Sequence, residues 1–259
     1  MPLYRRRLIR PLRRARVASV RRRTRRRVRR RGMRRGALAI ALTVGATVLV
    51  LSATAGPAAA ASGCGGAARA AGNSTRTITS GGRTREFVLT VPAGYDPDVR
   101  HPLVFDFHGL GSDGPKEVVY SELATTAAAS GSLAITPSAL RGTWAAPPLP
   151  RDLTFVDDLT VWAKAHLCVD ADRVFAGGIS NGSLLAGGLG CERPHRFAAL
   201  ALVAGPSLPR PCPDEDPLPM IAFAGTADPI VPYEGGEALG FPVPPVEDAS
   251  AAVATERNG

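Results

Sequence analysis

Apolar residues recur along the chain in two patterns that predict strands. Residues 85–91 alternate apolar and polar side chains, as a half-buried strand does. Short, mostly apolar runs, such as residues 102–107, are typical of strands that are buried on both faces of a parallel sheet. The expected strands are residues 76–79, 85–91, 102–107, 133–136, 173–177, 198–203 and 220–224.

Two segments between these strands have helical character. We expect one helix over residues 116–130, ended by Gly131, and a clearer one over residues 154–167. One face of the second helix carries Phe155, Leu159, Trp162 and His166. Because strands alternate with helices, the sequence predicts an α/β fold, in which helices flank a mainly parallel sheet on both faces.

The net charge of +10 is concentrated at the N-terminus. Residues 1–35 carry 18 arginines and no acidic residue, residues 36–61 carry no charge, and residues 62–259 have a net charge of −8. The expected folded domain, residues 62–259, is therefore acidic and follows an Arg-rich leader. Such a leader could bind nucleic acid or anionic lipid. We favour a true start at Met33 instead, which leaves a signal peptide of normal length and no nucleic-acid partner.

An apolar run at residues 37–55 follows the basic residues and ends in small residues up to Ala61. These are the parts of a secretory signal peptide. A permanent transmembrane helix would also fit the length, but the cleavable small residues favour cleavage. We expect residues 36–61 to be removed, the membrane contact to be transient and the protein to be secreted, with lipid attachment at Cys64 as an alternative.

Export would place four cysteines in an oxidising compartment, where an even number indicates two disulfides. Three pairings are possible. One of them closes a short loop between Cys191 and Cys212 and ties Cys64 to Cys168. A metal site is a poorer interpretation, because no pair has CxxC spacing and no histidine clusters with them. We expect no metal and no organic cofactor.

The strongest chemical motif is Gly178-Ile179-Ser180-Asn181-Gly182, a G-x-S-x-G directly after the expected strand 173–177. A sharp strand-to-helix turn at this place would expose the Ser180 hydroxyl as a nucleophile. It would also aim the backbone N–H of Asn181 at an oxyanion. A glycine-rich turn with an incidental serine is the alternative.

Two further turns would complete such a site. His108-Gly109 follows the strand 102–107, where the N–H of Gly109 or Leu110 could be the second oxyanion donor. Asp228 follows the strand 220–224, where the acid of a serine–acid–histidine triad is expected.

No histidine in the sequence suits the role of base. The chain has four, His101, His108, His166 and His195, and none follows Asp228. We interpret all four as structural or surface residues. Without a base, a serine hydroxyl is a poor nucleophile.

These motifs resemble the exported esterases of the polyhydroxybutyrate-depolymerase family, which share their fold with feruloyl and acetylxylan esterases. The resemblance covers residues 62–259. It rests on residues 62–65, 85–92, 94–96, 107–109, 155–158, 168–170, 173–176, 178–182 and 225–233.

The resemblance implies an α/β-hydrolase in which Ser180 is the nucleophile and Asp228 is the acid. The family's histidine lies in a Gly-His segment after a final strand, so the chain resembles a C-terminally truncated and inactive member. The implied partner is an ester, either polymeric or small: a polyhydroxyalkanoate, a feruloylated or acetylated polysaccharide, or a small ester. A non-catalytic secreted binding protein with the same fold is the second hypothesis. Trp144 and Tyr233 could line the substrate pocket, although core packing is the favoured role.

Overall fold

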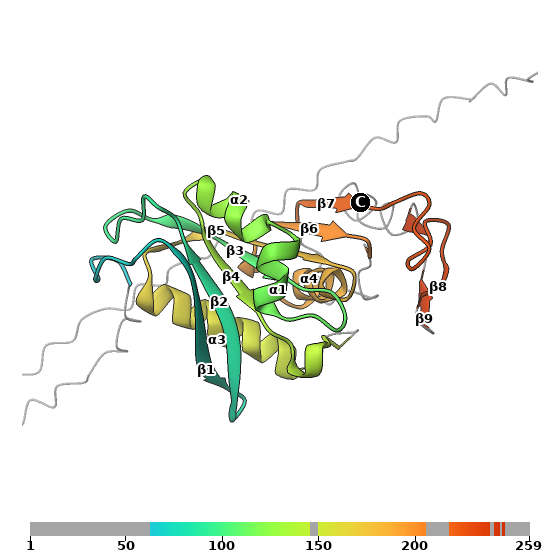
Figure 1. The fold of residues 1–259 in the computed structure, drawn as a ribbon, viewed down its shortest axis with the longest axis horizontal. Coiled ribbons are helices and arrows are strands. Elements are labelled where there is room, and N and C mark those ends of the chain that lie inside the picture. Colours follow the sequence, from blue (N-terminus) through green and yellow to red (C-terminus); the bar gives the residue numbers. More distant parts are fainter. Residues whose placement is uncertain (1–62, 146–149, 206–217, 239–240, 244, 247–259) are drawn as a thin grey trace, which may run out of the picture. The chain divides into compact units, whose positions relative to one another are not determined.

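The computed structural model describes residues 63–145, 150–205, 218–238, 241–243 and 245–246. Figure 1 shows the elements. The strands are β1 (Gly72–Ser80), β2 (Arg83–Val91), β3 (His101–Phe107), β4 (Leu133–Pro137), β5 (Val169–Ile179), β6 (Ala199–Val203), β7 (Met220–Phe223), β8 (Gly236–Ala238) and β9 (Phe241–Val243). The helices are α1 (Gly114–Tyr120), α2 (Leu123–Ala129), η1 (Leu140–Gly142), α3 (Pro150–His166), α4 (Asn181–Glu192) and η2 (Pro194–Arg196).

Within the described residues, seven strands form one sheet in the order β1-β2-β4-β3-β5-β6-β7. β1, β2 and β4 pair antiparallel, whereas β4, β3, β5, β6 and β7 run parallel. Phe107 pairs with Gly178, and Val203 pairs with both Ile179 and Phe223, so these strand ends are aligned. The segments that follow the four strands therefore leave the sheet on one side, where the carboxyl ends of the strands lie. We call this side the carboxyl edge. In open α/β sheets this edge is where ligands bind.

The predicted α/β architecture is confirmed, and each predicted strand overlaps an observed one. The single helix expected over residues 116–130 is wrong, because the segment forms α1 and α2 instead. Glu122 between them has a positive φ of 54°, a left-handed conformation that no α-helix can continue through. The small hairpin of β8 and β9 was not predicted.

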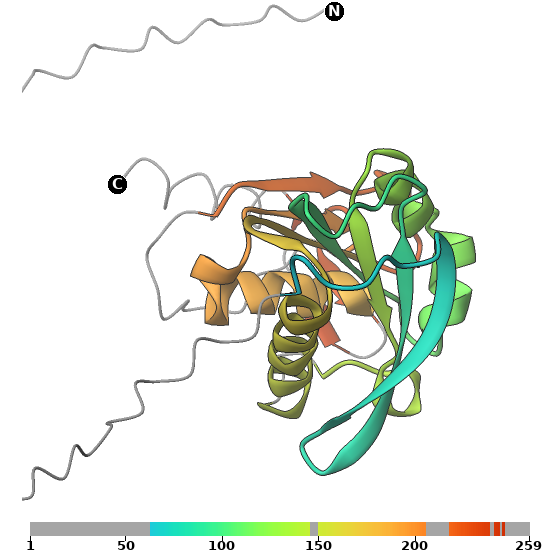
Figure 2. The ribbon, with the colours of Figure 1, turned by 90° about the vertical axis from the view of Figure 1, so that its left-hand side faces the viewer.

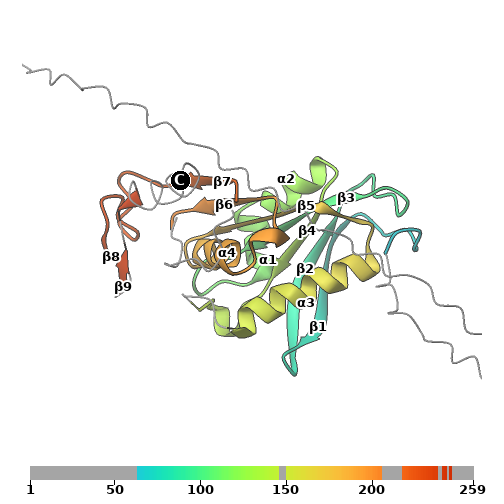
Figure 3. The same ribbon diagram turned by 180° about the vertical axis from the view of Figure 1, so that it is seen from behind.

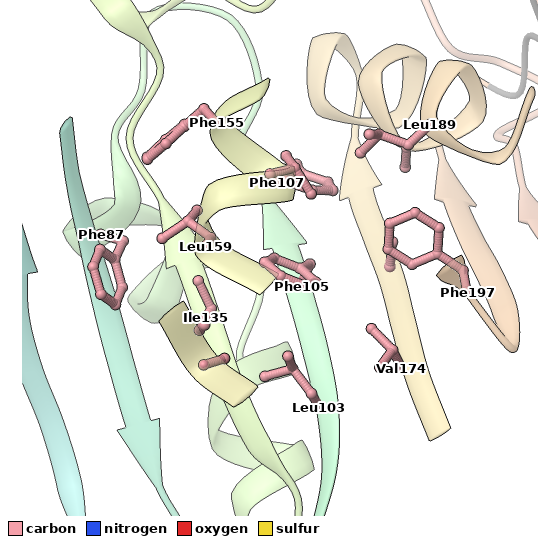
Figure 4. Packing of buried hydrophobic residues seen from close by; sticks show 14 of the residues in the cluster. Phe87, Leu103, Phe105, Phe107, Ile135, Phe155, Leu159, Val174, Leu189 and Phe197 are labelled. Carbon is pink, nitrogen blue, oxygen red and sulfur yellow. The ribbon is translucent and has the colours of Figure 1, made fainter. Parts of the chain in front are cut away.

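Helices cover both faces of the sheet. α1 and α2 pack against β2, β3 and β4 on the face seen in Figure 1, and α3 and α4 pack on the opposite face, seen in Figure 3. Figure 2 shows the sheet between the two pairs. The larger core lies under α3 and α4, where Phe155 and Leu189 gather with Phe105 and Phe107 of β3 (Figure 4). This core fixes the strand ends from which the candidate site is built.

A disulfide joins Cys64 to Cys168, just before β5. Of the pairings that the sequence allowed, this is the one that ties the N-terminal segment to the core. Cys191 is also disulfide-bonded, whereas Cys212 lies outside the described residues. The bond uses the Cys64 sulfur that a lipid anchor would need, so the lipidation alternative does not hold.

The expected leader and signal peptide, residues 1–61, also lie outside the described part of the chain. Among the helices of the described ranges, none is both long and apolar enough to cross a membrane.

Candidate active site

Ser180 lies in the turn between β5 and α4, immediately before the first helical residue. Its backbone has φ 52° and ψ −117°, a conformation that side-chain-bearing residues avoid. Its N–H donates to the carbonyl of Val203 (2.8 Å), and its carbonyl accepts from the N–H of Leu184 (3.1 Å). Strand β6 and helix α4 thus hold the strained turn. The turn expected at Ser180 is present, while the role of nucleophile stays a prediction.

The two outer glycines of the motif leave room for this turn. A Cβ on Gly178 would lie 2.6 Å from the carbonyl oxygen of Gly182 and 2.9 Å from that of Phe107. A Cβ on Gly182 would overlap the carbonyl oxygens of Phe107 and His108. Any side chain here would push α4 away from the end of β3. The glycines therefore allow the serine turn to approach the loop after β3.

That loop carries the expected oxyanion donors. A Cβ built on Gly109 would lie 3.8 Å from the Cβ of Ser180. The side chain of Leu110 is 51% exposed. Neither the Gly109 nor the Leu110 N–H donates a hydrogen bond to a described residue. The N–H of Asn181, at the start of α4, has no intrahelical acceptor either. The structure thus brings Gly109 to the turn that contains Ser180 and Asn181, and Leu110 follows Gly109 in the same loop.

His108 is buried behind this loop and is held as a neutral ring. Its Nε2 accepts the N–H of Ala139 (3.0 Å), so Nδ1 carries the proton and donates to the carbonyl of Gly109 (2.7 Å). Burial lowers the pKa of His108 below its ordinary value. Because both ring nitrogens are engaged with backbone groups, His108 is not available as the base for Ser180.

Trp144 connects the loop after β3 to the Ser180 turn. The sequence did not reveal this connection. The Trp144 indole Nε1–H donates to the carbonyl of His108 (3.1 Å). Its own backbone is bound twice by Asn181: Oδ1 accepts the Trp144 N–H (2.8 Å), and Nδ2 donates to the Trp144 carbonyl (2.9 Å). With 1% exposure Trp144 is a core residue, so a pocket-lining role is wrong. Tyr233 is half-buried in the loop after β7.

The other three histidines lie away from Ser180. His101 begins β3, and His195 lies in η2 just before β6, so both are at the amino edge of the sheet. His166 ends α3, before β5 begins, where its Nδ1 is 2.7 Å from the carbonyl of Trp162. With His108 engaged, none of the four histidines is placed to deprotonate the Ser180 hydroxyl.

Asp228 lies in the turn after β7, at the same carboxyl edge as Ser180. Its Oδ1 accepts the N–H groups of Val231 (3.0 Å) and Ile230 (2.8 Å), and these bonds lower the pKa of its carboxyl. The group is therefore ionised at neutral pH, as a triad acid must be. No hydrogen bond or ion pair joins it to a histidine among the described residues, so its role stays a prediction.

Two buried carboxyl groups lie on the face of the sheet that α1 and α2 cover. Asp106 of β3 is 1% exposed and Glu117 of α1 is 2% exposed. The Ser121 hydroxyl donates to Asp106 (2.7 Å), whereas Oε1 of Glu117 has no hydrogen-bond partner among the described residues. Burial raises the pKa of Asp106 to about 6, and burial together with the charge of Asp106 raises the pKa of Glu117 to about 7. In the described ranges, no three or more His, Cys, Asp and Glu residues are grouped to hold a metal ion.

Several proteins with sequences similar to this chain are named feruloyl esterases. No protein-family model matches the chain. Feruloyl esterase C of Emericella nidulans is 31% identical over 171 residues, which cover 63% of each protein. Feruloyl esterase D of Neurospora crassa is 28% identical over 205 residues, covering 74% of this chain and 70% of the relative. The chain is a homologue of feruloyl esterases. This confirms the resemblance seen in the sequence.

The chain matches only part of the length of these relatives. The chain spans 63% of the Emericella enzyme and 50% of NocK of Nocardia uniformis, to which it is 35% identical over 179 residues. Among solved structures, a thermostable esterase matches with a TM-score of 0.54 at 22% identity, covering 62% of this chain and 48% of that one. Thermogutta terrifontis esterase 2 matches with 0.55 at 18% identity, covering 72% and 80%. The fold of this feruloyl esterase homologue is the α/β-hydrolase fold, as predicted.

Proposed function

We propose that this feruloyl esterase homologue is a secreted serine esterase, in which a carboxylic ester acylates Ser180 once a base is supplied. The observation that carries the proposal is the strained Ser180 turn, held against the Gly109 loop at the carboxyl edge of an α/β-hydrolase sheet. The names of the relatives favour feruloylated polysaccharides as substrates. Acetylated polysaccharides, polyhydroxyalkanoates and small esters have the same reacting group.

Each residue of the site has a role in this reaction. The Ser180 oxygen attacks the ester carbonyl, and the charge on the carbonyl oxygen is stabilised by the N–H groups of Asn181 and of Gly109 or Leu110. A base takes the Ser180 hydroxyl proton and passes it to the alcohol, which leaves as the acyl-enzyme forms. Water then attacks the acyl-enzyme, releases the acid and returns a proton to Ser180 through the same base. Asp228 would orient a histidine base and stabilise its charged form.

This reaction also needs a base that takes the proton of the Ser180 hydroxyl. Since none of the four histidines is placed at Ser180, we expect the 259-residue chain to turn over esters at close to the background rate. A small base in solution could replace the histidine, because the nucleophile and the oxyanion donors are already positioned.

Chemical rescue tests this proposal. The chain is incubated with p-nitrophenyl acetate, with and without imidazole, and acetylation is located by mass spectrometry of peptides. We expect imidazole to accelerate acetylation at Ser180, and we expect no such peptide in Ser180→Ala. Acetylation that is equal at Ser180 and at surface serines would contradict an activated site.

The second candidate is a non-catalytic secreted binding protein with the same fold. It is favoured by the engagement of both His108 ring nitrogens with the backbone. Such a protein would sediment with feruloylated arabinoxylan, and its Ser180 would not react with an organophosphate even when imidazole is present. Labelling of Ser180 under these conditions would rule it out.

Secretion belongs to the same proposal. The disulfide between Cys64 and Cys168 is typical of an oxidising compartment. We propose that residues 36–61 are the signal and cleavage region, that residues 1–35 are absent from the mature protein and that residues 62–259 are the esterase domain. N-terminal sequencing of the exported protein should give a start close to residue 62. A start within residues 1–35 would contradict this.

A further inference from the structure

Two neighbouring peptide carbonyls in the loop after β3 are each held by a side chain. The carbonyl of His108 accepts the indole N–H of Trp144 (3.1 Å), and the carbonyl of Gly109 accepts Nδ1–H of His108 (2.7 Å). In a trans peptide the C=O and the following N–H point in opposite directions. The first bond therefore sets the direction of the Gly109 N–H, and the second sets the direction of the Leu110 N–H.

The same loop is tied to the nucleophile turn through Trp144. Both backbone groups of Trp144 are bonded to the side chain of Asn181, the residue that follows Ser180. The N–H of Gly111 donates to the carbonyl of Gly142, two residues before Trp144 (2.8 Å). Hydrogen bonds thus run from the Ser180 turn to Trp144 and on to the loop that carries the candidate oxyanion donors.

We infer that His108, Trp144 and Asn181 are positioning residues, which orient the Gly109 and Leu110 N–H groups toward the oxygen of an ester bound at Ser180. The three side chains form this loop clamp, which acts through the backbone, and the side chains touch neither substrate nor reacting atoms. The inference rests on the proposed function. It assigns a positioning role to three polar side chains that are buried or half-buried. Packing alone does not require their polar groups: at Trp144, for example, a phenyl ring could fill most of the space of the indole.

A transition-state analogue separates positioning from packing. With imidazole supplied as the base that takes the Ser180 proton, phenylboronic acid forms a tetrahedral adduct with the serine oxygen, and one of its boronate oxygens would occupy the oxyanion position. Methyl ferulate serves as the ground-state ligand. Only an interaction that is stronger in the tetrahedral state should change the ratio of the two affinities. The test variants are Trp144→Phe, which removes the indole N–H, and Asn181→Leu. Their matched controls are Trp162→Phe and Asn73→Leu, on α3 and β1.

We expect both test variants to bind phenylboronic acid about ten- to a hundred-fold more weakly, and methyl ferulate within about two-fold of the parent. The controls should match the parent for both ligands. Thermal melting identifies any variant that is not folded, and Trp144→Phe is the milder change if Asn181→Leu unfolds. Equal weakening of both ligands would overturn the inference in favour of packing, and so would unchanged affinity for phenylboronic acid in the folded variants.

Two measurements distinguish failure of this inference from failure of the proposed function. If the parent and Ser180→Ala bind phenylboronic acid equally, with trigonal boron by ¹¹B NMR, no serine adduct forms and the proposed function fails. Amide hydrogen exchange then tests whether the loop clamp holds the loop after β3. Faster exchange of the Gly111 N–H in Trp144→Phe than in Trp162→Phe would support it, and equal exchange would overturn it.

Discussion

At the residue scale, the central feature is a serine whose backbone conformation suits glycine. The φ of 52° and ψ of −117° at Ser180 place its Cβ against its own peptide groups. Bonds to Val203 and Leu184 oppose the relaxation of this turn. Strain of this kind is typical of functional sites, where the surrounding structure holds a residue in an unfavourable conformation.

Replacement of the serine by glycine tests this strain. We expect Ser180→Gly to be about 1 kcal/mol more stable than Ser180→Ala, because glycine adopts the positive φ without cost while alanine retains the strain. Neither variant should be acetylated at position 180. The measurement is the free energy of unfolding in urea. Equal stability of the two variants would show that the turn is not strained.

The close approach at Gly182 gives a second prediction at this scale. A Cβ there would overlap the carbonyl oxygens of Phe107 and His108, so we expect Gly182→Ala to lower the free energy of unfolding by about 2–4 kcal/mol. Gly94→Ala is the matched control, because a Cβ at Gly94 would meet no atom within 4 Å. A Gly182→Ala protein as stable as the control would contradict the packing of α4 against the end of β3.

At the scale of elements, α1 and the sheet bury acidic groups as well as apolar ones where they pack together. Glu117 of α1 and Asp106 of β3 are both almost inaccessible, and Val118 is the apolar residue of α1 in the small core on this face. Burying carboxyl groups favours their neutral, protonated forms. The attachment of α1 should therefore depend on pH.

The sign of this dependence follows from the raised pKa values. In the unfolded chain the carboxyls of Asp106 and Glu117 titrate near their ordinary values of 3.8 and 4.5, whereas in the folded protein they titrate at about 6 and about 7. The folded state holds protons that the unfolded state has released. The stabilising contribution is thus fully present below about pH 4, and it is lost as the pH rises through about 6 and 7.

We expect this contribution to fall by at most about 3 kcal/mol for each group between pH 4 and pH 8. The double variant Asp106→Asn, Glu117→Gln should have a flatter pH profile than the parent and a higher melting temperature at pH 8. Glu86→Gln, at an exposed position of β2, is the control and should keep the parent's profile. Parallel profiles of parent and double variant would show that the pair does not titrate in this range.

At the scale of the whole molecule, the disulfide joins the beginning of the described chain to the residue just before β5. Cys64 and Cys168 are separated by 104 residues, and Cys168 is fully buried beside β5. The N–H of Gly63 also donates to the carbonyl of Lys164 at the end of α3 (2.8 Å). The cross-link therefore closes a loop that contains β1 to β4 and the helices α1, α2, η1 and α3.

Its removal should destabilise the protein strongly. For a loop of about 100 residues, the lost constraint on the unfolded chain corresponds to about 4 kcal/mol. We expect Cys64→Ala, Cys168→Ala to lower the melting temperature clearly while the fold is retained, as circular dichroism can show. An unchanged melting temperature would mean that this bond adds little to the stability of the protein.

Local patterns of the sequence were enough to predict the strands of the large sheet, the helix α3 and the turn at Ser180. Alternation along residues 85–91 and the glycine spacing around Ser180 each report on a few neighbouring residues, and local geometry decides them. The resemblance to exported esterases extended this to the α/β-hydrolase fold. The break at Glu122 was missed, because residues 116–130 contain no proline or glycine at that point to indicate it.

By itself, then, the sequence determined the order of the elements of the large sheet and the position of Ser180. Only the tertiary structure decided that Trp144 is buried, that both nitrogens of His108 are engaged and that Asp106 and Glu117 are buried on one face. The physical reason is sequence distance: the bonds that join Asn181 to Trp144 and His108 to Ala139 span 37 and 31 residues. No local pattern records such contacts, because they form only when the folded sheet brings its carboxyl ends together.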